Sequence, residues 1–328
     1  MSFISVLFAL LLEQVRPLSK GNPIHAGLRA WVRWSTQNFD AGKPFHGWLA
    51  WGFAVGGPSV AALLIYWLLI TFVGWPLGVI WSAAVLYACL GFRQFSFHFT
   101  EIRDALADGD EDRARELLAS WKQMDASELP RSEIVRHVIE HSVLSAHRHV
   151  FGVLAWFSVL AAFGFGPTGA VLYRLSEFVA RYWQHKRKAH HQPVSDALQQ
   201  TATVIWTAID WLPARITAIS FAVVGSFEDA IDGWRNYESR FNGDNDGIVL
   251  AATAGAVNIR LGVAAPVTAA AANGAPALPP GTVDRRREAR PGQTPELAHL
   301  VIIVGLVWRA VVMWMFLLAL LTLARLLG

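Results

Sequence analysis

Charged residues are scarce in this chain of 328 residues, since Asp, Glu, Lys and Arg together make up 16% of it. A soluble globular protein carries about 25% charged residues, so an ordinary cytosolic enzyme is excluded. Cysteine is almost absent: Cys89 stands alone within an apolar run, which excludes a secreted disulfide scaffold. A hydrophobic share of 54% likewise excludes a disordered regulator.

Familiar catalytic motifs are also missing. The sequence has no G-x-x-x-x-G-K-[ST] phosphate loop, no G-x-S-x-G elbow and no Cys/His zinc spacing. The net charge is only +3, and the basic residues flank apolar runs instead of forming one concentrated basic face. Nucleic acid is therefore not an expected partner.

Apolar runs and tryptophan are abundant. The mean hydropathy is +0.35 and the chain has 15 Trp, a residue that gathers where hydrocarbon meets lipid headgroups. We predict an all-α, polytopic membrane helix bundle, with residues 1–328 forming a single integral membrane domain. The expected spans are residues 3–14 (marginal in length), 49–72, 76–92, 150–165, 167–183, 204–224 and 300–323.

Turn residues divide these runs. The segments Gly74-Trp75-Pro76 and Gly164-Phe165-Gly166-Pro167 break two apolar blocks without any charge, which predicts two helical hairpins. The run 204–224 is interrupted by Asp210, Pro213 and Arg215, which predicts a broken or re-entrant helix. Residues 100–124 have the pattern of an amphipathic helix that lies on the core.

The basic residues predict the orientation. Most of them fall in the connections 15–47, 93–149, 184–203 and 225–299, whereas the two hairpin tips have no Lys or Arg. The positive-inside rule then predicts a multi-pass protein of the bacterial inner membrane, with its main loops cytoplasmic and membrane lipid as a partner. The N-terminal run lacks a basic n-region and a cleavage site, so we do not expect a cleaved signal peptide.

Two groups of polar residues are candidates for function. His137 and His141 share a helix face and could hold a metal ion, or they could simply face acidic headgroups beside the membrane, as the group His185, His190 and His191 would. Asp210 and Arg215 lie within an apolar run, where ionisable side chains are costly. They could be functional, or they could form a structural ion pair at the helix break.

Five segments resemble the CobD/CbiB family of cobalamin-biosynthesis membrane proteins, which is related to AmpE. In chain order they are G-N-P-I-H at 21–25, L-G-F-R at 90–93, V-I-E-H-S-V at 138–143, D-W-L-P-A-R at 210–215 and A-G-A-V-N-I-R-L-G at 254–262. The likeness covers most of the chain. The opening F-A-L-L-L-E-Q and the stretch from His190 to Arg215 are closest to AmpE.

The resemblance implies an amide ligation of adenosylcobyric acid with aminopropanol or its phosphate, with ATP and magnesium as cofactors and a corrinoid as ligand. It makes Glu140 and Asp210 the candidate catalytic residues, Glu140 as a base or a metal ligand. It makes Arg93 and Arg215 anion clamps, and places Asn22 and His25 at the cytoplasmic mouth of the substrate site. No metal ligand set is assigned.

Several acidic residues of the family are replaced here. Asn22, Leu144, Leu250 and the pair Trp206-Thr207 stand where the family has carboxylates. Two interpretations follow: a ligase-like enzyme, which could be catalytically degenerate, or an AmpE-like regulatory membrane protein without catalysis. A transporter is a third interpretation with less support, because Asp210 and Arg215 are the only clear intramembrane ionisable pair. The sequence leaves the oligomeric state and the interaction partner open.

Overall fold

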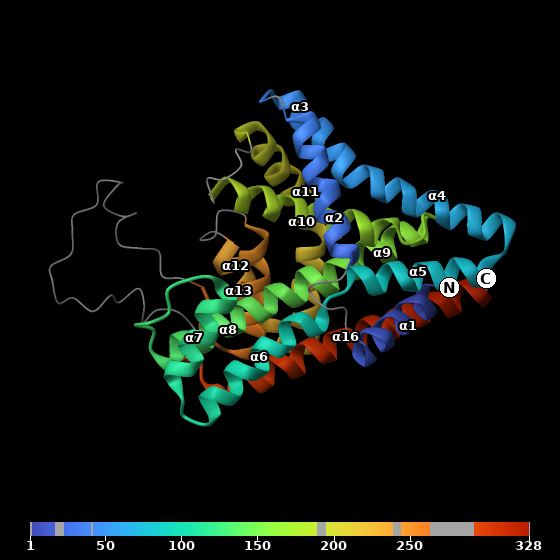
Figure 1. The fold of residues 1–328 in the computed structure, drawn as a ribbon. Helices are drawn as coiled ribbons and strands as arrows, with labels where there is room; N and C mark the ends of the chain where they lie inside the picture. Colours follow the sequence, from blue (N-terminus) through green and yellow to red (C-terminus); the bar gives the residue numbers. More distant parts are fainter. Residues whose placement is uncertain are drawn as a thin grey trace.

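The computed structural model describes residues 2–16, 23–40, 42–188, 195–238, 244–262 and 292–327. Within these ranges every extended regular element is a helix, and the only β-type pairing is an isolated bridge between Ile259 and Gln293. The predicted all-α bundle is therefore confirmed (Figure 1).

Both predicted hairpins are present. In the first, α3 (Pro44–Trp51), the π-turn η1 (Gly52–Gly56) and α4 (Gly57–Phe72) form one rod, which turns at Gly74 (φ 109°) into α5 (Trp75–Cys89). In the second, α9 (Gly152–Ala162) turns at Gly164 (φ 83°) into α10 (Thr168–Lys188). Their tips touch, since the indole N–H of Trp67 donates to the Gly164 carbonyl at 3.1 Å.

The two ends of the chain lie beside these tips. Helix α1 (Ser2–Val15) packs along α5, and α16 (Leu297–Leu327) returns to the same end of the molecule, where both termini and the α4–α5 turn are found (Figure 1). The opposite end holds α6 (Phe92–Ala107), α7 (Glu111–Lys122) and α8 (Arg131–Ala146).

Four helical rods are long and apolar enough to cross a membrane: Phe45–Phe72, Arg131–Ala162, Asp196–Val224 and Leu297–Ala324. Two shorter apolar helices, Ser2–Val15 and Trp75–Cys89, accompany them. Large apolar side chains on their outer faces are open, as at Phe72, which is 80% exposed. Such surface is tolerated in lipid, so the chain is a membrane protein.

Helix α10 covers the predicted span 167–183 but is not one of the four candidate spans. It carries the charged residues Arg174, Glu177 and Arg181.

The predicted break near residue 210 is wrong, because α11 (Asp196–Val224) is one continuous helix that includes Pro213. A proline inside a helix has no N–H to offer the carbonyl four residues earlier, here that of Ile209. The Trp156 indole N–H donates to that carbonyl at 2.9 Å. The lost hydrogen bond is thus replaced from α9, and the helix continues.

Two more expectations need correction. The second hairpin does not begin at residue 150, because α8, the π-turn η2 (His147–Phe151) and α9 form one rod over 131–162. The amphipathic stretch 100–124 is two helices, α6 and α7, since the backbone turns at Gly109 (φ 81°) and Asp110 then caps α7 by accepting the Arg113 N–H.

Three other helices complete the fold. Helix α2 (Pro23–Phe39) packs across α3, while α12 (Phe227–Glu238) and α13 (Asn245–Val257) form a closely packed pair against α11. Gly255 allows this approach, since a Cβ there would overlap the backbone of Asp229. The main apolar core surrounds α8 and η2, where Ile139, Val143 and Phe151 are fully buried.

Candidate functional site

The π-turn η2 presents three consecutive polar residues, His147, Arg148 and His149, in the middle of the long rod. A π-turn is an irregularity that is frequent at functional sites. Each of the three side chains meets a different distant segment of the chain, so three separate parts of the sequence come together at η2.

His147 holds the interior of α11. Its Nε2 lies 3.0 Å from Asp210 Oδ1, and its Nδ1 lies 2.9 Å from Thr217 Oγ1. The Tyr173 hydroxyl also donates to Asp210 Oδ1, at 2.7 Å. Since Asp210 is 1% exposed, a polar substrate cannot reach its carboxylate in this conformation. Asp210 is thus placed to fix helices relative to one another.

Arg148 reaches the start of α13, where its guanidinium forms an ion pair with Asp246. Asp244 caps the same helix by accepting the Asp246 N–H at 3.3 Å. Partial burial, followed by the neighbouring Asp246 carboxylate, raises the pKa of Asp244 above its usual value. Glu177 and Asp210 are also within electrostatic range of Arg148. The guanidinium therefore lies among three carboxylates, of which Glu177 is also paired with Arg174 and Arg181.

Arg215 does not pair with Asp210, contrary to one of the two interpretations of the sequence. Five residues rotate a helix by about 140°, so the two side chains leave α11 in different directions. The Arg215 guanidinium lies over the Trp211 ring at 4.1 Å, and Nη1 donates to Asn245 Oδ1 at 3.4 Å. Arg215 therefore also reaches the start of α13, next to Asp246.

Glu140 forms a second polar cluster on the rod. Its Oε1 accepts from Arg136 Nη1 at 2.6 Å and from the Gly262 N–H at 2.9 Å. The segment 138–143 thus meets the segment 254–262. Glu140 precedes His147 by seven residues, or about 10 Å along a helix axis. The two predicted catalytic residues, Glu140 and Asp210, therefore belong to neighbouring clusters and not to one shared site.

The two histidines that could have held a metal ion, His137 and His141, have other neighbours. His137 Nδ1 lies 3.0 Å from Lys122 Nζ, and its Nε2 lies 3.2 Å from Arg136 Nη2. His141 packs against the Trp121 ring at 4.4 Å. Burial lowers the pKa of Lys122. Among the described residues, no group of three or more His, Cys, Asp or Glu side chains could hold a metal ion.

Three predicted substrate-binding residues fall where the structure is not described. Asn22 lies outside the described residues, and for His25 in α2 and Arg93 in α6 only the backbone is described. The segment 90–93 nevertheless reaches η2, because a Cβ at Gly91 would lie 3.5 Å from His149 Nδ1. The segments 90–93, 210–215 and the start of α13 therefore all meet at the three polar residues of η2.

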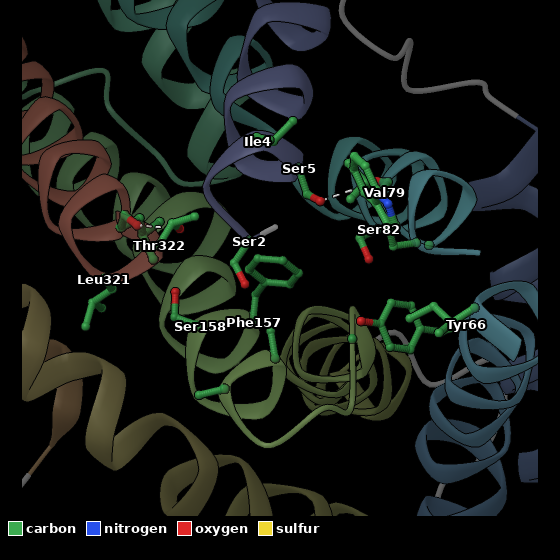
Figure 2. A pocket seen from close by; sticks show the side chains of 17 residues that line it. Ser2, Ile4, Ser5, Tyr66, Val79, Ser82, Phe157, Ser158, Leu321 and Thr322 are labelled. Atoms are coloured by element: carbon green, nitrogen blue, oxygen red, sulfur yellow. Dashed lines mark hydrogen bonds between the residues drawn. The ribbon is translucent and has the colours of Figure 1, made fainter. Parts of the chain in front are cut away.

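A cavity of about 580 Å³ lies elsewhere, among α1, the two hairpins and the end of α16. Figure 2 shows the hydroxyl groups of Ser82, Ser158 and Tyr66 directed into it. Its lining has no charged side chain, and it includes none of the residues predicted to act on substrate. The cavity is therefore separate from the polar clusters of the rod.

Reasoning from the sequence missed Arg148, Asp246 and Tyr173. Asp246 and Arg148 lie in connections predicted to be solvated, where charged residues are common and do not indicate a site. The one available signal is the H-R-H triplet directly before an apolar run, where three polar residues cannot all face outward.

These features define a polytopic helical membrane protein whose polar side chains gather along one long rod. Residues 6–276 match the model of the family described as CobD/Cbib protein. The chain belongs to the CobD/CbiB family. It is 30% identical over 321 residues to the cobalamin biosynthesis protein CobD of Stutzerimonas stutzeri (strain A1501), with 96% of each chain covered. It is 31% identical over 218 residues to the protein of that name from Chromobacterium violaceum, with 65% of this chain and 66% of that one covered. No solved structure matches.

Proposed function

We propose that this protein is an inner-membrane enzyme of cobalamin biosynthesis. It would join the carboxylate of adenosylcobyric acid to the amino group of aminopropanol or its phosphate, giving adenosylcobinamide or its phosphate. The observation that carries the proposal is the meeting of family segments on one rod, with 90–93 and 210–215 at η2 and 254–262 at Glu140. The names of the two relatives support the pathway.

The start of α13 offers the groups that this chemistry needs. ATP, as co-substrate, would convert the carboxylate into an acyl phosphate. The amine nitrogen then attacks the acyl carbon, the new C–N bond forms, and phosphate leaves with the C–O electron pair. Arg215 would bind the phosphate of the amine substrate, and buried Asn245 would position the guanidinium by accepting from Arg215 Nη1. Asp244, whose carboxyl group is partly desolvated but still open to solvent, has a raised pKa and would accept the proton that the nitrogen loses.

A protein-held magnesium ion does not fit the described residues. Asp246 is engaged by Arg148, and Glu140 by Arg136, so each of these carboxylates already has a positive partner.

The direct test is product formation. Purified protein is incubated with adenosylcobyric acid, aminopropanol phosphate, ATP and magnesium, and the corrinoid products are separated by chromatography and weighed by mass spectrometry. We expect a product heavier by the amine minus one water. If an active homologue gives product under the same conditions and this protein gives none, the ligase proposal fails.

Arg215 allows a sharper version of this test. Arg215→Gln should raise the KM for aminopropanol phosphate by tenfold or more and change the KM for free aminopropanol by less than threefold, because only the first carries a phosphate. Arg309→Gln is the matched control, since Arg309 also lies on an apolar helix and donates to the carbonyl four residues earlier. Equal effects of Arg215→Gln on both amines would contradict the assigned role.

The same proposal places the α7 end of the molecule in the cytoplasm. Ser120 is exposed on α7 and Phe163 is 74% exposed at a hairpin tip. With Cys89 replaced by Ser, we expect an impermeant maleimide added to spheroplasts to label Phe163→Cys and to leave Ser120→Cys unlabelled until lysis. Labelling of Ser120→Cys before lysis would reverse the orientation.

An AmpE-like regulatory protein is the second candidate, and one observation favours it. Trp206, which stands where the family has an acidic residue, packs against the Tyr173 ring at 5.2 Å. Apolar packing has thus taken the place of polar chemistry on this turn of α11. Trp206→Glu distinguishes the candidates: a gain of ligase activity in an otherwise inactive protein would identify a degenerate enzyme.

A further inference from the structure

Helix α2 has basic residues and no acidic one, whereas α6, α7 and α8 each contain both. Pro23–Phe39 contains Arg29 and Arg33 but no Asp or Glu. Both arginines are exposed, and neither forms an ion pair with a described residue. By contrast, Arg113, Arg115 and Arg136 all pair with carboxylates of their own helices. The adjoining sequence at 17–22 also contains no acidic residue.

The other flank of α2 is aromatic. Trp31 and Trp34 stack at 5.2 Å and are 37% and 46% exposed. With 100° of rotation per residue, the pair Arg29 and Arg33 and the pair Trp31 and Trp34 are centred about 150° apart around the helix. A helix with these two flanks suits the boundary of a membrane, with indoles toward hydrocarbon and guanidinium groups toward headgroups.

The packing of α2 places it beside the first part of a candidate span. Ser35 Oγ donates to the Ala50 carbonyl at 2.8 Å, and the Trp31 indole N–H donates to the Phe53 carbonyl at 3.2 Å. These bonds tie α2 across the rod Phe45–Phe72, which is a candidate span, close to the π-turn where the rod enters its most apolar part. Trp48 and Phe53 of that rod are 55% and 45% exposed, so they extend the aromatic flank.

We propose that α2 is a binding site for the phosphate groups of anionic phospholipids, with Arg29 and Arg33 as the ligands and Trp31 and Trp34 as the interfacial anchor. Charge complementarity selects this occupant, since these two guanidinium groups are exposed and no carboxylate of the described residues forms an ion pair with either. The proposal does not depend on ligase activity.

The test measures lipid preference on the full-length protein in detergent. Native mass spectrometry gives apparent Kd values for dioleoylphosphatidylglycerol and dioleoylphosphatidylcholine, and their ratio is the preference. A basic side chain near a charged surface contributes about fivefold in affinity, so Arg29→Gln/Arg33→Gln should lower the preference by about tenfold or more. Arg29→Lys/Arg33→Lys keeps the charge and should retain most of the preference.

Arg103→Gln/Arg113→Gln is the matched control, because these exposed arginines of α6 and α7 pair with Asp104 and Glu116. It should change the preference by less than twofold. An unchanged preference in the α2 double variant would overturn the proposal, as would an equal loss in the control. Loss of preference in the lysine variant to the level of the glutamine variant would also overturn it, because charge is the stated cause.

Discussion

Replacing the buried Asp210 separates a structural role from a catalytic one. In Asp210→Ala, His147 Nε2 and the Tyr173 hydroxyl lose their shared acceptor inside the core. Each buried polar group without a partner costs about 1–3 kcal/mol, and the missing carboxylate leaves a small void as well. We therefore expect the free energy of unfolding to fall by about 3–5 kcal/mol, the range found when one member of a buried pair is removed.

Two companion variants set the scale of this effect. Tyr173→Phe removes one hydrogen bond and should cost about 1 kcal/mol, as single interhelical bonds in membranes do. The double variant should cost less than the sum of the two single changes, because both remove the same bond. Ser59→Ala is the control, since Ser59 is buried but bonds only the carbonyl of Val55 in its own rod, and it should cost well under 1 kcal/mol.

The assay pairs thermal unfolding in detergent with ligase turnover measured well below the unfolding temperature. If Asp210 fixes helices, the loss of turnover should follow the loss of folded protein, and Asp210→Asn, which keeps the shape and one acceptor oxygen, should recover much of both. An unchanged unfolding temperature combined with a turnover reduced a hundredfold would refute the structural role and return Asp210 to the catalytic residues.

Three further predictions concern other parts of the molecule. Arg136→Met should lower the free energy of unfolding by about 3 kcal/mol or more, measured by chemical denaturation, because buried Glu140 loses its ion pair; a neutral result would contradict this. Burial lowers the pKa of Lys122, so the charged ammonium group destabilises the folded protein at neutral pH. This destabilisation decreases as the pH rises towards the pKa that Lys122 has in the unfolded chain. Lys122→Met should therefore unfold at a higher temperature than the natural protein at pH 7, with the gap narrowing by pH 9.5; a gap that widens would refute the sign. Gly255→Ala should abolish stable expression because its Cβ overlaps the Asp229 backbone, whereas Gly305→Ala, with open space around it, should be neutral or stabilising when both are compared by fluorescence-detected gel filtration.

Local sequence signals were sufficient for the hairpins. Gly74 and Gly164 adopt positive φ values that favour glycine, and neither turn contains a charge, so a tight connection between two apolar helices was the simple interpretation. The five-residue spacing of Asp210 and Arg215 already contained the fact that they leave the helix in different directions. The predicted ion pair rested on their shared apolar surroundings and did not take this spacing into account.

Long-range contacts explain what the sequence could not provide. Pro213 predicts a break, and only the fold shows that Trp156, 57 positions earlier, supplies the missing donor to Ile209. Arg148 was placed in a loop because nothing local reveals that Asp246, 98 positions later, lies opposite it. The resemblance to the family pointed to the right segments, but not to the three residues of η2 at which they meet.

The π-turn at 147–151 also makes the residue count of the long rod a structural constraint. Removing one residue from a regular α-helical part of the rod, between Glu140 and the turn or between the turn and Trp156, would rotate Trp156 by about 100° relative to α8, since an α-helix advances 100° per residue. Trp156 would then face away from Ile209, and the Ile209 carbonyl would lose its hydrogen-bond donor. A deletion in one rod would therefore destabilise α11 at Pro213. Relatives that keep this architecture should therefore tolerate substitutions between Glu140 and Trp156 far better than changes of length.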